Sequence, residues 1–249
     1  MIIITTAHEE RYRGCTIRLE YDQNPESPRE WDNVGTMVCW HGRYDLGDEQ
    51  PKEDPSEYKL NLLRGDAAFD RADAWFDRIL AGGDDDAVAR ARLHWIAARD
   101  GAMERSGLIM LPLYLYEHSG ITISTGSFSC RWDSGQVGFI YCTMAKARKE
   151  WGEKYNPGIT DKEIRAKAIA CMKSEVKTYA AFLEGHVVGY IAEDPYGKQI
   201  NSCWGYYPEE DDYAYAIREA KSDIDHWHTE RDAEAKEKTY WEQRDTLTV

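Results

Sequence analysis

The segment from Thr160 to Leu183 constrains the fold of this chain more than any other. Its first four residues, Thr160-Asp161-Lys162-Glu163, have the spacing of a capping box, in which hydroxyl and carboxylate each accept from the other residue's backbone N–H. Apolar side chains then recur three and four residues apart, which is typical of a helix with one buried face. They are Ile164, Ala168, Met172, Val176, Tyr179 and Leu183. We expect a long helix packed on a sheet.

Short apolar and alternating runs before and after this helix predict strands. They lie at 15–21, 36–40, 108–116, 121–124, 137–141, 187–192 and 199–204. Pro112 has no N–H to donate, so it confines its run to an edge or an irregular position. The last two runs flank Asp194-Pro195-Tyr196-Gly197, whose turn residues predict a hairpin.

Two further helical regions complete the expected fold. Asp66 and Asp84 stand as N-caps before helical patterns separated by Gly82-Gly83, which predicts a helical hairpin at about 66–100. Residues 210–245 predict a long, charged C-terminal helix, and the acidic stretch 45–57, with two prolines, predicts an exposed loop. We therefore expect one α+β domain over 1–249, with a mixed or antiparallel sheet, packed helices and a long C-terminal helix.

The chain has 45 acidic residues against 31 lysines and arginines, a formal net charge of −14. Cations drive binding to phosphate backbones and to anionic membrane surfaces, so this charge argues against direct binding to either. No apolar run approaches the roughly 20 residues of a membrane span. The start, Met1-Ile2-Ile3-Ile4, lacks the basic residues of a signal peptide. We expect a cytoplasmic protein.

Six cysteines are spaced irregularly and include no Cys-x-x-Cys pair, so they predict free thiols packed as small apolar groups. A zinc site drawn from Cys39, His41, His118, Cys130 or Cys203 is chemically possible. However, Cys39 and Cys203 are each followed directly by a tryptophan, and Cys130 precedes Trp132 by two positions. Consecutive residues along a strand point to opposite faces of the sheet. Burial of one residue of each pair is the simpler interpretation. We expect no metal and no cofactor.

The densest group of reactive residue types lies between Glu117 and Gln136. Cys130 is a nucleophile type and His118 a base type, while Asp133 could orient the base and Gln136 could stabilise an oxyanion. A cysteine hydrolase needs this set, because it must form a thiolate and stabilise a developing negative charge. The alternative is a glycine-rich loop whose polar side chains satisfy backbone groups.

Carboxylates gather where the C-terminal helix is expected to begin. They are Glu209, Glu210, Asp211, Asp212, Glu219 and Asp223. The helix dipole and a solvated face account for such residues, and a partner-binding surface is the alternative interpretation. Both stay open at this point.

Two stretches, Leu113–Tyr141 and Gly189–Tyr207, resemble a family of bacteriophage and conjugative-element proteins without an established activity. The shared words are Tyr116-Glu117-His118-Ser119-Gly120, Cys130-Arg131-Trp132-Asp133-Ser134-Gly135-Gln136-Val137-Gly138 and Ser202-Cys203-Trp204-Gly205. The resemblance implies a context, since small acidic proteins of mobile elements often block a host defence protein by binding it. It assigns no residue a role.

Two hypotheses follow. The first is a non-enzymatic interaction protein that inhibits a bacterial defence complex, such as CRISPR-Cas or restriction, through acidic faces that mimic nucleic acid. Its partner would be a host protein or a protein–nucleic-acid complex. The second is a cysteine-dependent hydrolase or transferase centred on Cys130 and His118. The sequence leaves the oligomeric state open.

Overall fold

The computed structural model describes residues 6–152, 154–208 and 213–246, and of residues 241–246 the backbone alone. The chain forms two compact units. The central unit comprises residues 29–179, and the terminal unit comprises residues 1–28 and 180–249. Each contains one four-stranded antiparallel sheet and a long helix, so the expected α+β fold with a long C-terminal helix is confirmed.

The sheet of the central unit has the strand order β3-β6-β4-β5. Its strands are β3 (Thr36–Cys39), β4 (Leu108–Glu117), β5 (Ile121–Ser124) and β6 (Ser134–Thr143). β5 pairs with β4 only from Tyr114 onward, whereas Pro112 pairs with Phe139 of β6 on its other side. Pro112 therefore lies at a local edge of the sheet, where its missing N–H is tolerated, as expected.

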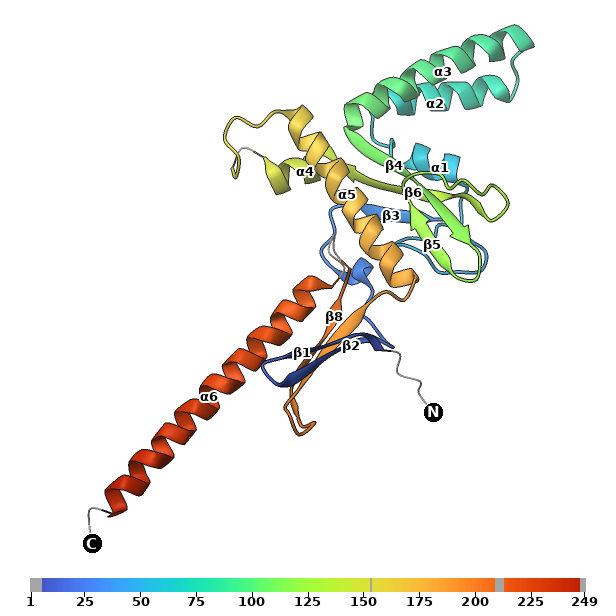
Figure 1. The fold of residues 1–249 in the computed structure, drawn as a ribbon. Coiled ribbons are helices and arrows are strands. Elements are labelled where there is room, and N and C mark those ends of the chain that lie inside the picture. The colour runs from blue at the N-terminus through green and yellow to red at the C-terminus, as the bar shows by residue number, and fades with distance from the viewer. Residues whose placement is uncertain (1–5, 153, 209–212, 247–249) are drawn as a thin grey trace. The chain divides into compact units, whose positions relative to one another are not determined.

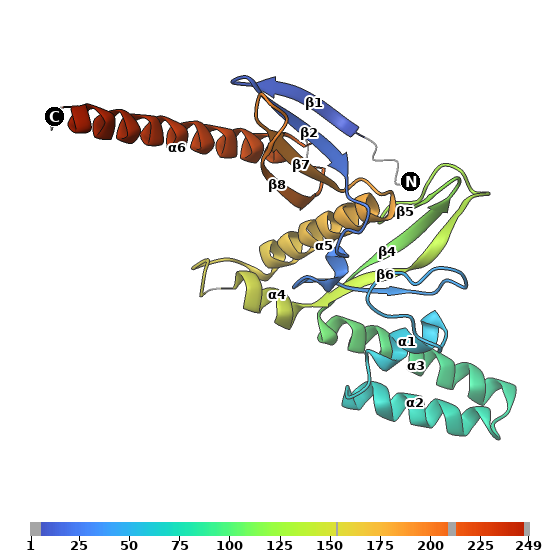
Figure 2. The same ribbon diagram turned by 90° about the horizontal axis from the view of Figure 1, so that it is seen from below.

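Helix α5 (Asp161–Leu183) covers one face of this sheet with its residues up to Tyr179 (Figures 1 and 2). Glu163 accepts a hydrogen bond of 2.8 Å from the Thr160 N–H, and Thr160 Oγ1 accepts one of 3.3 Å from the Glu163 N–H, which confirms the capping box. The predicted stripe is buried from Ile164 to Tyr179. A side chain at Gly35 would collide with both Ile140 of β6 and Met172, so helix and sheet are in close contact there.

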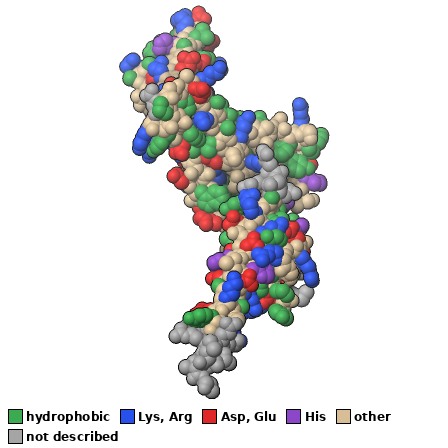
Figure 3. All heavy atoms as spheres, turned by 60° about the vertical axis from the view of Figure 1, so that its left-hand side comes forward, with side chains coloured by type: hydrophobic (Ala, Val, Ile, Leu, Met, Phe, Trp, Pro, Cys, Tyr) green, Lys and Arg blue, Asp and Glu red, His purple; other side chains and the backbone are tan. Residues whose placement is uncertain are grey.

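The other face of the sheet is covered by α1 (Pro55–Asn61), followed by the helical pair α2 (Ala67–Leu80) and α3 (Asp85–Ser106) (Figure 2). Tyr58 of α1 packs with Val38 and Phe139. Asp66 and Asp84 accept hydrogen bonds from the first backbone N–H groups of α2 and α3, as their N-cap positions predict. Acidic and basic side chains are interspersed over this hairpin (Figure 3). A short helix, α4 (Met144–Trp151), follows β6.

The prediction of an exposed loop over 45–57 is wrong in two places. Leu46 is fully buried, and α1 already begins at Pro55. The Arg29 side chain is 5% exposed and therefore needs counter-charges. It binds Asp48 from this segment at 2.6 Å and Glu175 of α5 at 3.3 Å.

The terminal unit joins the two ends of the chain in one sheet, with the order β1-β2-β7-β8 (Figure 1). Its strands are β1 (Thr6–Tyr12), β2 (Cys15–Tyr21), β7 (Val188–Glu193) and β8 (Gln199–Tyr206). The tight turn between β1 and β2 places Arg13 and Gly14 at positive φ, as a two-residue hairpin loop requires. Helix α6 (Ala214–Thr246) packs on this sheet through Ala216, Ala220 and Ile224.

Candidate functional site

The carboxylates predicted to bind a partner fall into two groups in the structure. Glu209, Glu210, Asp211 and Asp212 lie outside the described residues. Asp223 on α6 faces its own sheet, where its Oδ2 accepts hydrogen bonds from the buried Tyr190 hydroxyl and, at 2.8 Å, from Asn201 Nδ2. Burial and this carboxylate raise the pKa of Tyr190. Asp223 therefore anchors the helix to the sheet.

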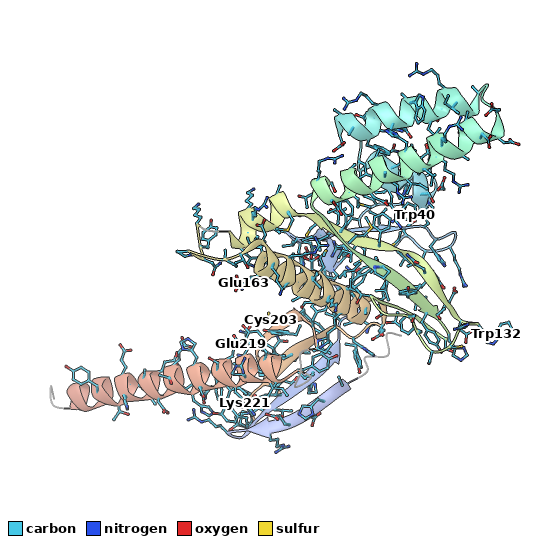
Figure 4. The ribbon with its side chains drawn as sticks, turned by 90° about the horizontal axis from the view of Figure 1, so that it is seen from above. Trp40, Trp132, Glu163, Cys203, Glu219 and Lys221 are labelled. Atoms are coloured by element: carbon cyan, nitrogen blue, oxygen red, sulfur yellow. The ribbon has the colours of Figure 1, made fainter. Side chains whose placement is uncertain are left out.

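Asp225, two residues after Asp223 on α6, repeats this anchoring on the β1 side. Asp225 accepts hydrogen bonds from Arg13 Nη1 at 2.7 Å and from the Tyr12 hydroxyl at 3.1 Å. The Arg13 guanidinium, and the Tyr12 hydroxyl with it, lower the pKa of Asp225. Lys221 binds Glu10 at 2.7 Å. Glu219 lies on the β8 side of the helix, near Cys203 (Figure 4), where its charge adds to the burial that raises the pKa of Tyr206.

Beyond Trp227 the character of α6 changes. Arg231 stacks over the Trp227 ring, 4.8 Å from its centroid, and every side chain from Thr229 to Tyr240 is exposed. A helix that is polar on all sides is held by its own backbone and by pairs three and four residues apart rather than by a core. Between Thr229 and Tyr240, α6 therefore has no buried side chain that anchors it to the sheet.

The four residues of the second hypothesis come from three neighbouring segments. Cys130 and Asp133 lie in the loop between β5 and β6, Gln136 lies in β6, and His118 lies in the turn between β4 and β5. Cys130 Sγ donates to Asp133 Oδ2 at 3.2 Å, and His118 Nδ1 lies 3.7 Å from the same oxygen. The carboxylate thus stands between the sulfur and the imidazole. Gln136 Nε2 donates to the Gly138 carbonyl at 3.3 Å.

This order differs from the one that cysteine hydrolysis requires. There the imidazole contacts the sulfur, takes its proton, and is itself oriented by a third group. Here Cys130 donates to Asp133 Oδ2, His118 lies near that same oxygen, and the Gln136 amide is bonded to its own strand. Cys130, His118 and Asp133 are brought together, but not in the arrangement of a nucleophile and its base.

A cleft of about 320 Å³ opens beside this group, at the end of the sheet where β4 meets β5 and β6. Trp132 lines its rim and is 97% exposed at the tip of its loop (Figure 4). Trp40 and His41 come from the segment after β3. The other lining residues are Leu115, Glu117, Asp133, Ser134, Gly135, Gln136 and Val137.

The wall formed by Trp40 and His41 is fixed by hydrogen bonds. Trp40 Nε1 donates to the Glu53 carbonyl at 2.7 Å, and its ring packs edge-on against Tyr58. His41 Nδ1 accepts from the Arg43 and Tyr44 backbone N–H groups at 3.2 and 3.1 Å. A neutral His41 therefore carries its proton on Nε2.

The sequence holds a signal for this cleft that motif reasoning missed. Trp40 and Trp132 stand in two of the three Cys-Trp words noted above, but 92 positions apart. β3 brings them together because it pairs closely with β6: a Cβ on Gly138 would lie 1.9 Å from the Val38 carbonyl oxygen. Only glycine allows that approach.

Three of the six thiols have the environment expected of packed cysteines. Cys15, Cys39 and Cys142 are buried, whereas Cys130 and Cys171 are half-buried and Cys203 is exposed. Burial raises the pKa of Cys39 to about 12 and, with the nearby Glu175, that of Cys171 to about 11. Among the described residues, no three His, Cys, Asp or Glu side chains gather as a metal site would require.

No protein-family model, curated protein or solved structure matches this chain. Within the described ranges, no helix has the length and apolar character needed to cross a membrane.

Proposed function

We propose that this chain acts by binding a protein partner with a basic surface, without catalysing a reaction. The resemblance to phage and conjugative-element proteins extends the proposal to a role: inhibition of a bacterial defence complex in the host cytoplasm, by occupying a site that otherwise receives nucleic acid.

The observation that carries the proposal is the uneven division of charge. The terminal unit has 21 acidic residues against 10 lysines and arginines, a net of −11. The central unit has 24 against 21, a net of −3. A surface with so strong a single sign attracts an oppositely charged groove at long range and raises the association rate.

The arrangement around Cys130 supports binding over catalysis. The imidazole of His118 and the sulfur of Cys130 meet only through Asp133, and the cleft beside them is wide and open. Exposed tryptophans such as Trp132 are typical of binding surfaces, where aromatic rings contribute much of the energy.

The partner is to be captured from a bacterial host lysate and its association rate with the chain measured at two salt concentrations. Reversal of Glu210 and Asp212 to lysine should slow association at low salt, and moderate salt should slow the parent likewise, because exposed charges are screened over about 10 Å at 0.1 M. The matched control is Asp77→Lys with Asp86→Lys, which changes the net charge equally on the exposed surface of the central unit. Equal rates for parent and Glu210/Asp212 variant at both salt concentrations would contradict the acidic-face proposal.

The rival enzyme has its own test. Cys130→Ser removes the only sulfur in the cluster and should leave biological activity within a few-fold of the parent. A loss of a hundredfold or more, with the variant's circular dichroism and melting unchanged, would favour the hydrolase or transferase instead.

A further inference from the structure

We propose that the cleft beside Trp132 binds the guanidinium group of an arginine side chain presented by the partner protein. This inference rests on the proposed function, which supplies a basic partner, and it names the place where one of that partner's cations is received.

The lining of the cleft has the chemistry that a guanidinium requires. Trp40 and Trp132 bring aromatic rings to the lining, and a planar cation stacks over such rings. Glu117 and Asp133 offer carboxylates whose side chains are 38% and 37% exposed, so both are open to a ligand without being fully hydrated. None of the described residues that line the cleft is a lysine or an arginine. The lining thus carries two carboxylates and no cation of its own, and one of the carboxylates, Glu117, is paired with Arg43.

The molecule already binds one guanidinium at the rim. Arg43 Nη1 donates to Glu117 Oε1 at 2.7 Å, and the Tyr44 hydroxyl donates to the same oxygen at 2.8 Å. The Arg43 guanidinium carbon lies 5.2 Å from the centroid of the Tyr44 ring. Carboxylate contact together with stacking on an aromatic ring is thus the local mode of holding a guanidinium, and the Arg43 side chain that is held this way is 73% exposed.

Charge separates arginine from the other ligands that stack on tryptophan. A nucleotide would bring phosphates toward Glu117 and Asp133, which repel them. An uncharged sugar would form hydrogen bonds with the lining but no ion pair with its carboxylates. An arginine gains from both the rings and the carboxylates, and its charge-assisted hydrogen bonds are stronger than neutral ones.

The test uses a small probe, so it does not need the partner. N-acetyl-arginine amide is titrated into the full chain while the indole N–H signals of Trp40 and Trp132 are followed by NMR, each assigned through its Trp→Phe variant. N-acetyl-citrulline amide, which has nearly the same shape and no charge, is the matched control. We expect saturable shifts with the arginine probe and at least about fivefold weaker binding of citrulline, consistent with the strength of charge-assisted contacts. Equal binding of the two, or shifts caused only by methyl glucoside, would overturn the inference.

Three variants sharpen the result. Trp132→Ala removes a side chain that is 97% exposed, so the fold should be kept, and the probe should bind about two- to fivefold more weakly. Tyr196→Ala removes an aromatic ring that is 92% exposed on the terminal unit and should change nothing. Arg43→Ala releases Glu117 and should strengthen binding. Unchanged affinity in both Trp132→Ala and Arg43→Ala would contradict the site.

The two proposals fail separately. If the arginine probe binds but no basic partner is found, the proposed function is wrong and the cleft stands. If a basic partner binds with equal affinity to the parent and to Trp132→Ala, and the probe is silent, the cleft is wrong and the proposed function stands.

Discussion

Both units pack a long helix on a four-stranded antiparallel sheet, but with different chemistry at the contact. In the central unit α5 buries a stripe of larger side chains, with Met172 against Ile140. In the terminal unit α6 uses the small side chains of Ala216 and Ala220. Asp223 and Asp225 then add hydrogen bonds to tyrosines on the strands.

This difference shows what an acidic helix can be for. Carboxylates near the start of α6 invite interpretation as a free surface, yet Asp223 and Asp225 face the sheet that the helix covers. The number of carboxylates on a helix therefore does not give the number that a binding partner can contact. The acidic surface of the terminal unit has to be sought in its other carboxylates.

The largest expected effect tests the apolar interface. Met172→Asp places an uncompensated charge in a fully buried position and should lower the free energy of unfolding by about 3–5 kcal/mol. Met172→Leu, which keeps the volume, should cost less than about 1.5 kcal/mol. Urea unfolding of the three chains decides, and a Met172→Asp variant as stable as the parent would show that this face of α5 is misplaced.

The second effect tests the polar interface. Asp223→Ala leaves the Tyr190 hydroxyl, on a residue 3% exposed, without its acceptor, and should cost about 1–3 kcal/mol in urea unfolding. Glu234→Ala removes an exposed carboxylate further along the same helix and should change stability by no more than about 0.5 kcal/mol. Equal losses in the two variants would erase the distinction between anchoring and solvated carboxylates.

A third prediction concerns acid. The pKa of Asp225 is lowered from its usual 3.8, so its contribution to stability is present above that value and is lost as the pH falls through the lower, folded pKa. Asp225→Asn should be less stable than the parent at pH 7, and the difference should vanish in strong acid. Thermal melts from pH 7 down to pH 2 measure it, and a difference that grows on acidification would reverse the assigned sign.

The smallest expected effect is a difference in local opening free energy between the two halves of α6. Amide hydrogen exchange should be slow between Ala216 and Ile224, which are buried, and fast between Thr229 and Tyr240, which have no buried side chain. The buried stripe of α5, from Ile164 to Tyr179, should be protected throughout. Uniform protection along α6 would indicate that its second half is covered in solution.

Much of the fold follows from local chemistry that the sequence displays. The capping box at Thr160, the N-caps Asp66 and Asp84, and the turn between β7 and β8 depend on residues within a few positions of one another. The assembly of the strands into two sheets does not, because β2 pairs with β7 across most of the chain. No periodicity within either strand specifies that partner.

The candidate sites also contain one feature that the local sequence could predict and others that it could not. The inward position of Asp223 was open to prediction, since it lies three residues after Ala220 and four before Trp227, on the face that packs. The cleft was not, because Trp40 and Trp132 come to line the same cleft only through the pairing of β3 with β6. Nor does the sequence reveal that Asp133 stands between Cys130 and His118, which is a matter of side-chain direction in a loop.

The sheet shared by both chain ends also sets an order of events during synthesis. The first hairpin, β1–β2, leaves the ribosome 166 residues before β7 begins. At roughly 5–20 residues per second, β2 waits about 8 to 33 seconds for its neighbour, while the whole central unit emerges and can fold. During that interval the nascent chain presents an unpaired strand edge with Ile17 and Leu19 uncovered, a substrate for chaperones and for pairing with a neighbouring nascent chain.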